Sequence, residues 1–126
     1  MKRKSKWVPS EEDEQKAVAM YLDTLGVLWC HVPNGGARHK IVGAKLKGQG
    51  VKRGVPDIII FTPPPFDLRK RGAVIELKNR NGGKVSTEQR AWLEELEKLG
   101  WLVAICKGAD EAIKQIEAWG YGSGYD

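Results

Sequence analysis

Two short apolar runs with charged ends constrain the fold of this chain more than any other feature. Pro56–Phe61 (PDIIIF) carries an acid, Asp57, near its start, and Ala73–Lys78 (AVIELK) ends in Glu76–Lys78. Charged groups at the ends of buried strands are unfavourable unless other groups compensate them. The two runs therefore predict neighbouring buried strands whose charged ends serve a chemical purpose.

Side-chain alternation along the second run places its charges together. Successive side chains of a strand point to opposite faces, so Glu76 and Lys78 share one face and Leu77 anchors the other in the core. If the two runs pair antiparallel, Asp57 lies near Glu76 and Lys78. Two neighbouring carboxylates repel unless a proton or a cation lies between them, and Mg²⁺ and Mn²⁺ prefer such oxygen ligands. Carboxylates, lysine and metal together can activate water for attack on phosphorus.

The remaining pattern predicts one α/β domain, in which a mixed sheet is flanked by helices in the order α-β-β-β-α-β-α. Its 126 residues, 41% of them hydrophobic, suit a single core. Helices are expected over 11–26, 87–100 and 109–120, and strands over 27–32, 56–61, 73–78 and 101–106. The short link between the second and third strands favours an antiparallel pair.

The ends of the chain have a different composition. We expect residues 1–9 to form a flexible basic arm, 10–119 the folded domain and 120–126 a flexible tail. No apolar run is long enough to span a membrane, and the basic N-terminus lacks the apolar stretch of a secretory signal. Cys30 and Cys106 lie in apolar runs and are expected to be buried and unpaired in a reducing compartment.

A long glycine-rich basic segment, HVPNGGARHKIVGAKLKGQGVKRG (31–54), separates the first two expected strands. Loops of this length are uncommon in compact domains unless they bind something. Such a loop can follow a sugar-phosphate backbone closely and release counterions, and the net charge of +5 is compatible with a polyanion partner. The candidate DNA-binding residues are Asn34, Arg38, Lys45, Lys52 and Arg53. A merely solvated loop is the alternative.

Four fragments occur together in an order that resembles a known nuclease family. They are Glu11-x-x-x-Gln15, Gly54-Val55-Pro56-Asp57, Glu76-Leu77-Lys78 and Ser86-x-x-Gln89-x-x-Trp92. The second and third resemble the PD-(D/E)XK nuclease signature. All four, over residues 10–118, resemble a stand-alone VRR-NUC domain of the phage or bacterial type. The resemblance implies a restriction-endonuclease-like fold and a divalent-metal-dependent DNA endonuclease.

The resemblance also implies residue roles. Asp57, Glu76 and the backbone carbonyl of Leu77 would bind Mg²⁺, for which Mn²⁺ can substitute. Lys78 would orient the attacking water, and Gln89 would form a hydrogen bond near the catalytic lysine or the phosphate. A glutamate of the first helix would complete the site. The family spacing favours Glu11, and Glu14 is the alternative.

The substrate follows from the same resemblance. It implies structure-specific cutting of branched, four-way-junction-like DNA by a homodimer, in the DNA repair or recombination of a bacterial or phage-infected cytoplasm. The alternatives are a flap-type or sequence-specific nuclease of the same fold, an RNA-directed nuclease, and a DNA-binding module that does not cut.

Overall fold

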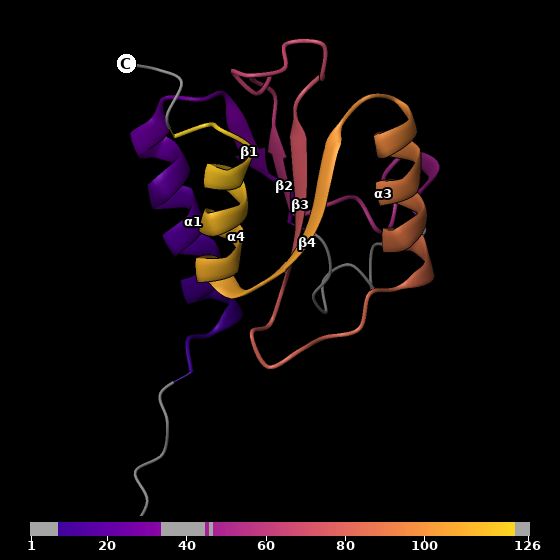
Figure 1. Ribbon diagram of the computed structural model, residues 1–126. Coiled ribbons are helices and arrows are strands. Elements are labelled where there is room, and N and C mark those ends of the chain that lie inside the picture. Colours follow the sequence, from indigo (N-terminus) through magenta and orange to yellow (C-terminus); the bar gives the residue numbers. More distant parts are fainter. Residues whose placement is uncertain (1–7, 34–44, 46, 123–126) are drawn as a thin grey trace, which may run out of the picture.

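The computed structural model describes residues 8–33, 45 and 47–122, and its main elements are three long helices and four strands (Figure 1). In chain order they are α1 (Glu11–Leu25), β1 (Trp29–His31), β2 (Ile58–Ile60), β3 (Ala73–Lys78), α3 (Thr87–Lys98), β4 (Leu102–Lys107) and α4 (Gly108–Ala118). The sheet has the order β1-β2-β3-β4. The pairs β1–β2 and β2–β3 are antiparallel, whereas β3–β4 is parallel. The predicted α/β class and mixed sheet are confirmed.

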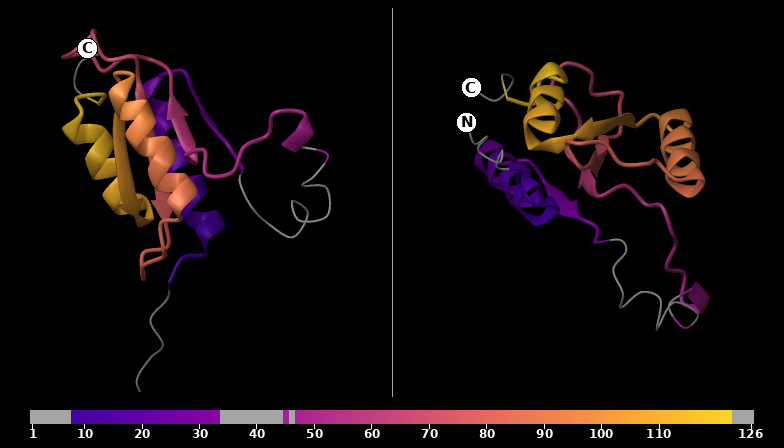
Figure 2. Two further views of the ribbon diagram at one scale, coloured as in Figure 1. Left: turned by 90° about the vertical axis from the view of Figure 1, so that its right-hand side faces the viewer. Right: turned by 90° about the horizontal axis from the view of Figure 1, so that it is seen from below.

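The helices lie on both faces of the sheet. Helices α1 and α4 pack together on one face, and α3 covers the other (Figure 2, right view). The core between the sheet and the first pair includes Val18 and Leu22 of α1, Ile58 and Ile75 of the sheet, and Ile116 of α4. Strands β3 and β4 end, and α1, α3 and α4 begin, at the same end of the molecule (Figure 1). Helix N-termini carry partial positive charge, so this end favours acidic groups.

Strands β1 and β2 are shorter than expected, at three residues each. Backbone hydrogen bonds nevertheless continue past both ends of this pair. The Val32 N–H donates to the Asp57 carbonyl at 2.7 Å, and the Phe61 N–H donates to the Leu28 carbonyl at 2.7 Å. The predicted ranges therefore include flanking residues that still interact across the pair.

Two residues just outside the expected bounds of the folded domain, 10–119, are buried in it. Tyr121, placed in the flexible tail, is fully buried, and its hydroxyl donates to the Thr62 carbonyl at 2.7 Å. Pro9, placed in the basic arm, is also buried. The folded domain thus includes both residues. A tyrosine between glycines gives little sequence signal, although its apolar ring and hydroxyl suit burial beside a carbonyl.

One expected buried cysteine is exposed. Cys106 is buried as expected, whereas Cys30 is exposed, and both are free thiols. Cys30 lies in β1, which forms an edge of the sheet. In the described part of the chain, no helix combines the length and the apolar character needed to cross a bilayer.

The Tyr121 contact predicts a measurable contribution to stability. Tyr121→Phe, which removes only the hydroxyl, should lower the free energy of unfolding by about 1 kcal/mol. Tyr121→Ala should lower it by about 3–5 kcal/mol, because it also leaves a cavity. Urea unfolding followed by tryptophan fluorescence measures both. The control Met20→Ala, at a side chain that is 71% exposed, should change it by less than about 0.5 kcal/mol. Wild-type stability of Tyr121→Ala would contradict the burial.

Candidate active site

The pairing of β2 with β3 brings the predicted acids together. Ile58 pairs with Ile75, so Asp57, just before β2, lies opposite Glu76. The Leu77 N–H donates to Asp57 Oδ2 at 2.7 Å, which fixes the aspartate against the neighbouring strand. The expected convergence of Asp57, Glu76 and Lys78 at one end of the sheet is confirmed.

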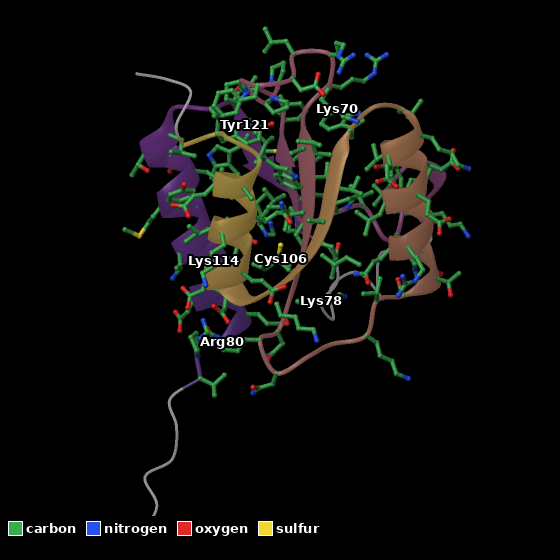
Figure 3. All side chains as sticks on the ribbon, in the orientation of Figure 1. Lys70, Lys78, Arg80, Cys106, Lys114 and Tyr121 are labelled. Atoms are coloured by element: carbon green, nitrogen blue, oxygen red, sulfur yellow. The ribbon has the colours of Figure 1, made fainter. Side chains whose placement is uncertain are left out.

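A pocket of about 400 Å³ opens at this end of the sheet. It is bounded by the first turns of α1, the end of β1, the residue before β2 and the end of β3. Its lining residues are Glu11, Glu12, Glu14, Gln15, Lys16, His31, Asp57, Leu77, Lys78 and Asn79. Three predicted catalytic residues, Glu11, Asp57 and Lys78, therefore share one pocket. Figure 3 shows Lys78 at this end of the molecule, away from Lys70 and Tyr121.

Gln89 connects the lysine to the buried glutamate. Lys78 Nζ donates to Gln89 Oε1 at 2.8 Å, and Gln89 Nε2 donates to Glu76 Oε2 at 2.7 Å. Lys78 Nζ also lies 3.5 Å from Glu76 Oε2. The predicted contact between Gln89 and the lysine is present. The contact with Glu76 was not anticipated, because helix and strand periodicity do not specify which side chains meet across a layer.

The start of α3 fixes the orientation of the Gln89 side chain. Ser86 and Gln89 form a capping box, in which Ser86 Oγ accepts from the Gln89 N–H at 3.0 Å. In return the Ser86 N–H donates to Gln89 Oε1 at 2.8 Å. Oε1 thus accepts from two donors, which sets the amide with its nitrogen toward Glu76.

Burial dominates the electrostatics of the two acids. Glu76 is only 2% exposed, and burial together with the negative charge of Asp57 raises the pKa of Glu76 to about 8. Burial also raises the pKa of Asp57, against the lowering effect of the hydrogen bond from Leu77. The charge of Lys78 opposes both increases. Two neighbouring carboxylates with a single ammonium group beside them form a site that favours a further cation.

The surroundings of one Glu76 oxygen indicate that the site fits a metal ion. Glu76 Oε1 is buried and has no hydrogen-bond partner. A buried, unpaired carboxylate oxygen is costly, and this one lies beside a second carboxylate. That donor set fits Mg²⁺ or Mn²⁺. No three His, Cys, Asp or Glu side chains among the described residues form a metal-binding group, so a cation here would also need the Leu77 carbonyl or water.

The structure separates the two candidate glutamates of α1. Glu14 is buried and occupied: its Oε2 accepts from Arg80 Nε at 2.9 Å, and its Oε1 from Arg80 Nη2 at 2.8 Å. Oε1 also accepts from the Ala109 N–H at 3.0 Å. Glu11 is exposed on the pocket wall. The contacts favour Glu11 as the glutamate that completes the site, and its catalytic role stays a prediction.

Glu14 also replaces a missing helix cap. The residue before α4, Lys107, makes no capping hydrogen bond with its side chain. The Glu14 carboxylate, held by Arg80, instead accepts from the second residue of that helix and places negative charge at its N-terminus. Arg80 follows Lys78 by two residues, so this cluster joins α1, α4 and the segment after β3 (Figure 3).

Two further residues of the pocket were not assigned from the sequence. His31 Nδ1 lies 2.9 Å from the Asp57 carbonyl oxygen. Gln15 Nε2 is buried and has no hydrogen-bond partner. Gln15 belongs to the first family fragment, which was the one signal for it, whereas no spacing pattern singles out His31.

The predicted DNA-binding residues lie outside this pocket or outside the described residues. Asn34 and Arg38 fall in the undescribed range 34–44. Lys45, Lys52 and Arg53 are exposed, and none of them lines the pocket. Their contact with DNA stays a prediction.

The mixed four-stranded sheet with helices on both faces matches the restriction-endonuclease-like fold. The family model of the VRR-NUC domain matches residues 9–110, and the chain belongs to this family of nucleases. A solved structure described as a VRR_NUC domain protein is similar at 25% sequence identity, with a TM-score of 0.73 and 91% of each chain covered. No curated protein matches the sequence.

The Glu14–Arg80 pair predicts a pH-dependent stability difference. The hydrogen bond from Arg80 lowers the pKa of Glu14, with help from the Ala109 N–H and against the effect of burial. A lowered folded-state pKa stabilises the fold above the ordinary pKa of glutamate, and this stabilisation is lost as the pH falls through the folded-state value. Arg80→Met should therefore lower the free energy of unfolding near pH 7, by less than the loss of a fully buried pair because the arginine side chain is 37% exposed.

The difference between Arg80→Met and wild type should shrink below about pH 4, as Glu14 becomes protonated. Urea unfolding at several pH values measures it. Lys16→Met is the matched control, because it breaks the exposed Glu12–Lys16 pair. That variant should unfold like wild type at every pH, because the pair is exposed to solvent. A difference for Arg80→Met that does not depend on pH would contradict the assignment.

Proposed function

We propose that this chain is a divalent-metal-dependent endonuclease that hydrolyses DNA phosphodiester bonds. The observation that carries the proposal is the buried Glu76 carboxylate beside Asp57: its Oε2 accepts from Gln89 and lies 3.5 Å from Lys78 Nζ, whereas its Oε1 has no partner. Family membership supports a nuclease. The donor set supports Mg²⁺, with Mn²⁺ as a substitute.

Asp57, Glu76 and the Leu77 backbone carbonyl would hold the ion. When bound, it lowers the pKa of water and acts as a Lewis acid toward the phosphate. Side chains of the protein position the water and the phosphate and offset the developing charge. Lys78 Nζ, fixed by Gln89 Oε1, holds the attacking water or a phosphate oxygen and offsets the negative charge that develops at phosphorus. Gln89 Nε2 occupies one oxygen of Glu76 and leaves the other for the cation. Glu11 adds a carboxylate from the pocket wall.

The proposed substrate is branched DNA of the four-way-junction kind, cut by a homodimer. One chain of 126 residues offers little surface to grip a junction, and two copies place two active sites on it. The excess of basic residues, including Lys45, Lys52 and Arg53, supports binding to phosphate groups. By its resemblance to the phage and bacterial type, the enzyme would act in the cytoplasm of a bacterial or phage-infected cell, in DNA repair or recombination.

Variants of the acidic site test the chemistry. Glu76→Gln and Lys78→Met should each lower the rate of cutting by at least about 100-fold, because each removes a charge from the reaction centre. Both should bind DNA within about threefold of wild type, since most of the affinity comes from phosphate contacts elsewhere. The control Glu94→Gln changes an exposed carboxylate of α3 and should cut normally. Single-turnover assays with Mg²⁺, Mn²⁺ or EDTA measure the rates. Normal cutting by Glu76→Gln, or in EDTA, would refute the proposal.

A panel of labelled DNA substrates tests the specificity. A four-way junction, a flap, single-stranded DNA and linear duplex are compared at equal concentration with wild type. The proposal predicts Mg²⁺-dependent cutting of the junction at its branch and at least about tenfold slower cutting of the duplex, a difference of about 1.4 kcal/mol in the barrier. Cutting of the flap alone, or of duplex at one sequence, would favour the alternative specificities. Tight binding without cutting of any substrate would leave a DNA-binding module.

A further inference from the structure

The end of the basic segment is attached to α3 by its backbone. The indole Nε1 of Trp92 donates to the Arg53 carbonyl at 2.9 Å. The next residue, Gly54, has a φ of +89° and packs against the first turn of the helix. A Cβ at Gly54 would lie 2.6 Å from the backbone carbon of Glu88 and 2.8 Å from the backbone nitrogen of Gln89. Because both are backbone atoms that cannot move aside cheaply, only glycine permits this close approach.

The first turn of α3 also contacts the active site. Gln89, in its first turn, contacts both Lys78 and Glu76. Trp92 follows Gln89 by three residues, a spacing that places two side chains on neighbouring positions of one helix face. Two adjacent positions of one helix therefore hold the reaction centre and the backbone that carries Lys52 and Arg53.

The Trp92 side chain makes a directional contact in addition to packing its ring. Tryptophan has one donor and no acceptor, and here that donor reaches the backbone of a residue 39 positions away. The carbonyl of Arg53 is held while its side chain is exposed. The bond thus fixes the direction of the chain without occupying the charged groups of Lys52 or Arg53.

We propose that Trp92 is a positioning residue for DNA: its indole N–H fixes the backbone at Arg53 and holds Lys52 and Arg53 at a set place relative to the metal site. This inference rests on the proposed function. A segment that is ordered before DNA binds loses little conformational entropy on binding. Its phosphate contacts therefore contribute more to the affinity. Trp92 itself touches neither DNA nor the reacting atoms in this scheme.

The variant Trp92→Phe tests the proposal, because it keeps an aromatic ring and removes the donor. Binding to a labelled junction is measured in EDTA over a series of salt concentrations, and single-turnover cutting is measured at saturating DNA with Mg²⁺. The Kd should rise about three- to tenfold, the change expected for one broken hydrogen bond. The slope of log Kd against log salt should become shallower by about 1 for each phosphate that is no longer neutralised. The rate at saturation should stay within about twofold of wild type, because Gln89, Lys78 and Glu76 are unchanged.

Two comparisons separate positioning from a general structural effect. Trp101→Phe makes the same chemical change at the other end of the sheet, where the Trp101 ring packs by Gly72, and it should leave both Kd and slope unchanged. In a Lys52→Ala/Arg53→Ala background, Trp92→Phe should have no further effect, because the groups that it positions are gone. Thermal unfolding of each variant confirms that it is folded at the assay temperature.

The outcomes distinguish this inference from the proposed function. If wild type binds and cuts DNA but Trp92→Phe matches it in Kd and slope, the inference alone is wrong. The inference is equally wrong if Trp92→Phe weakens binding by the same factor in the Lys52→Ala/Arg53→Ala background. If wild type neither binds nor cuts DNA, the proposed function fails and the inference fails with it.

Discussion

The burial of the Glu76 carboxylate is the constraint on which the arrangement of this domain depends. A carboxylate in a nearly dry position is unfavourable unless donors or a cation compensate it. Here one oxygen receives a hydrogen bond from Gln89 and lies near the Lys78 ammonium, whereas the other has no partner. Pairing with β2 then adds a second carboxylate, Asp57, at the same place. Burial and the Asp57 carboxylate raise the pKa of Glu76 to about 8, so the two acids need a proton or a cation between them, which is a feature of a site that binds a cation rather than of a stabilising ion pair.

The active site and the start of α3 share one side chain, that of Gln89. A capping box with Ser86 is an ordinary way to begin a helix, and it would form without any function. In this domain Gln89 Oε1 accepts from Lys78 as well as from the cap backbone. A change that frays the first turn of α3 would therefore also release the lysine. Stability of the helix start and placement of the lysine cannot be varied independently.

Most of the fold, and the convergence of the two acids and the lysine, could be predicted because they follow from local periodicity and strand pairing. Alternation along β3 was enough to place Glu76 and Lys78 on one face, and antiparallel pairing then brought in Asp57. The contacts that escaped prediction join residues distant in sequence. The bond between Glu14 and Arg80 spans 66 positions, and α4 gives no local signal for its cap, since Lys107 has no side-chain capping bond. The buried Tyr121 was missed for a similar reason, because its acceptor is 59 positions away.

The cap that Glu14 provides for α4 has a consequence for how the domain folds. It joins two residues 95 positions apart, so it can form only after the chain has closed a very large loop. The Glu14–Arg80 pair needs only α1 and the segment that follows Lys78, whereas the bond from the Ala109 N–H forms only when α4 docks. The residues that line the pocket all precede α4 in the chain, so the docking of α4 adds the positive end of this helix beside Glu14 and not the walls of the pocket.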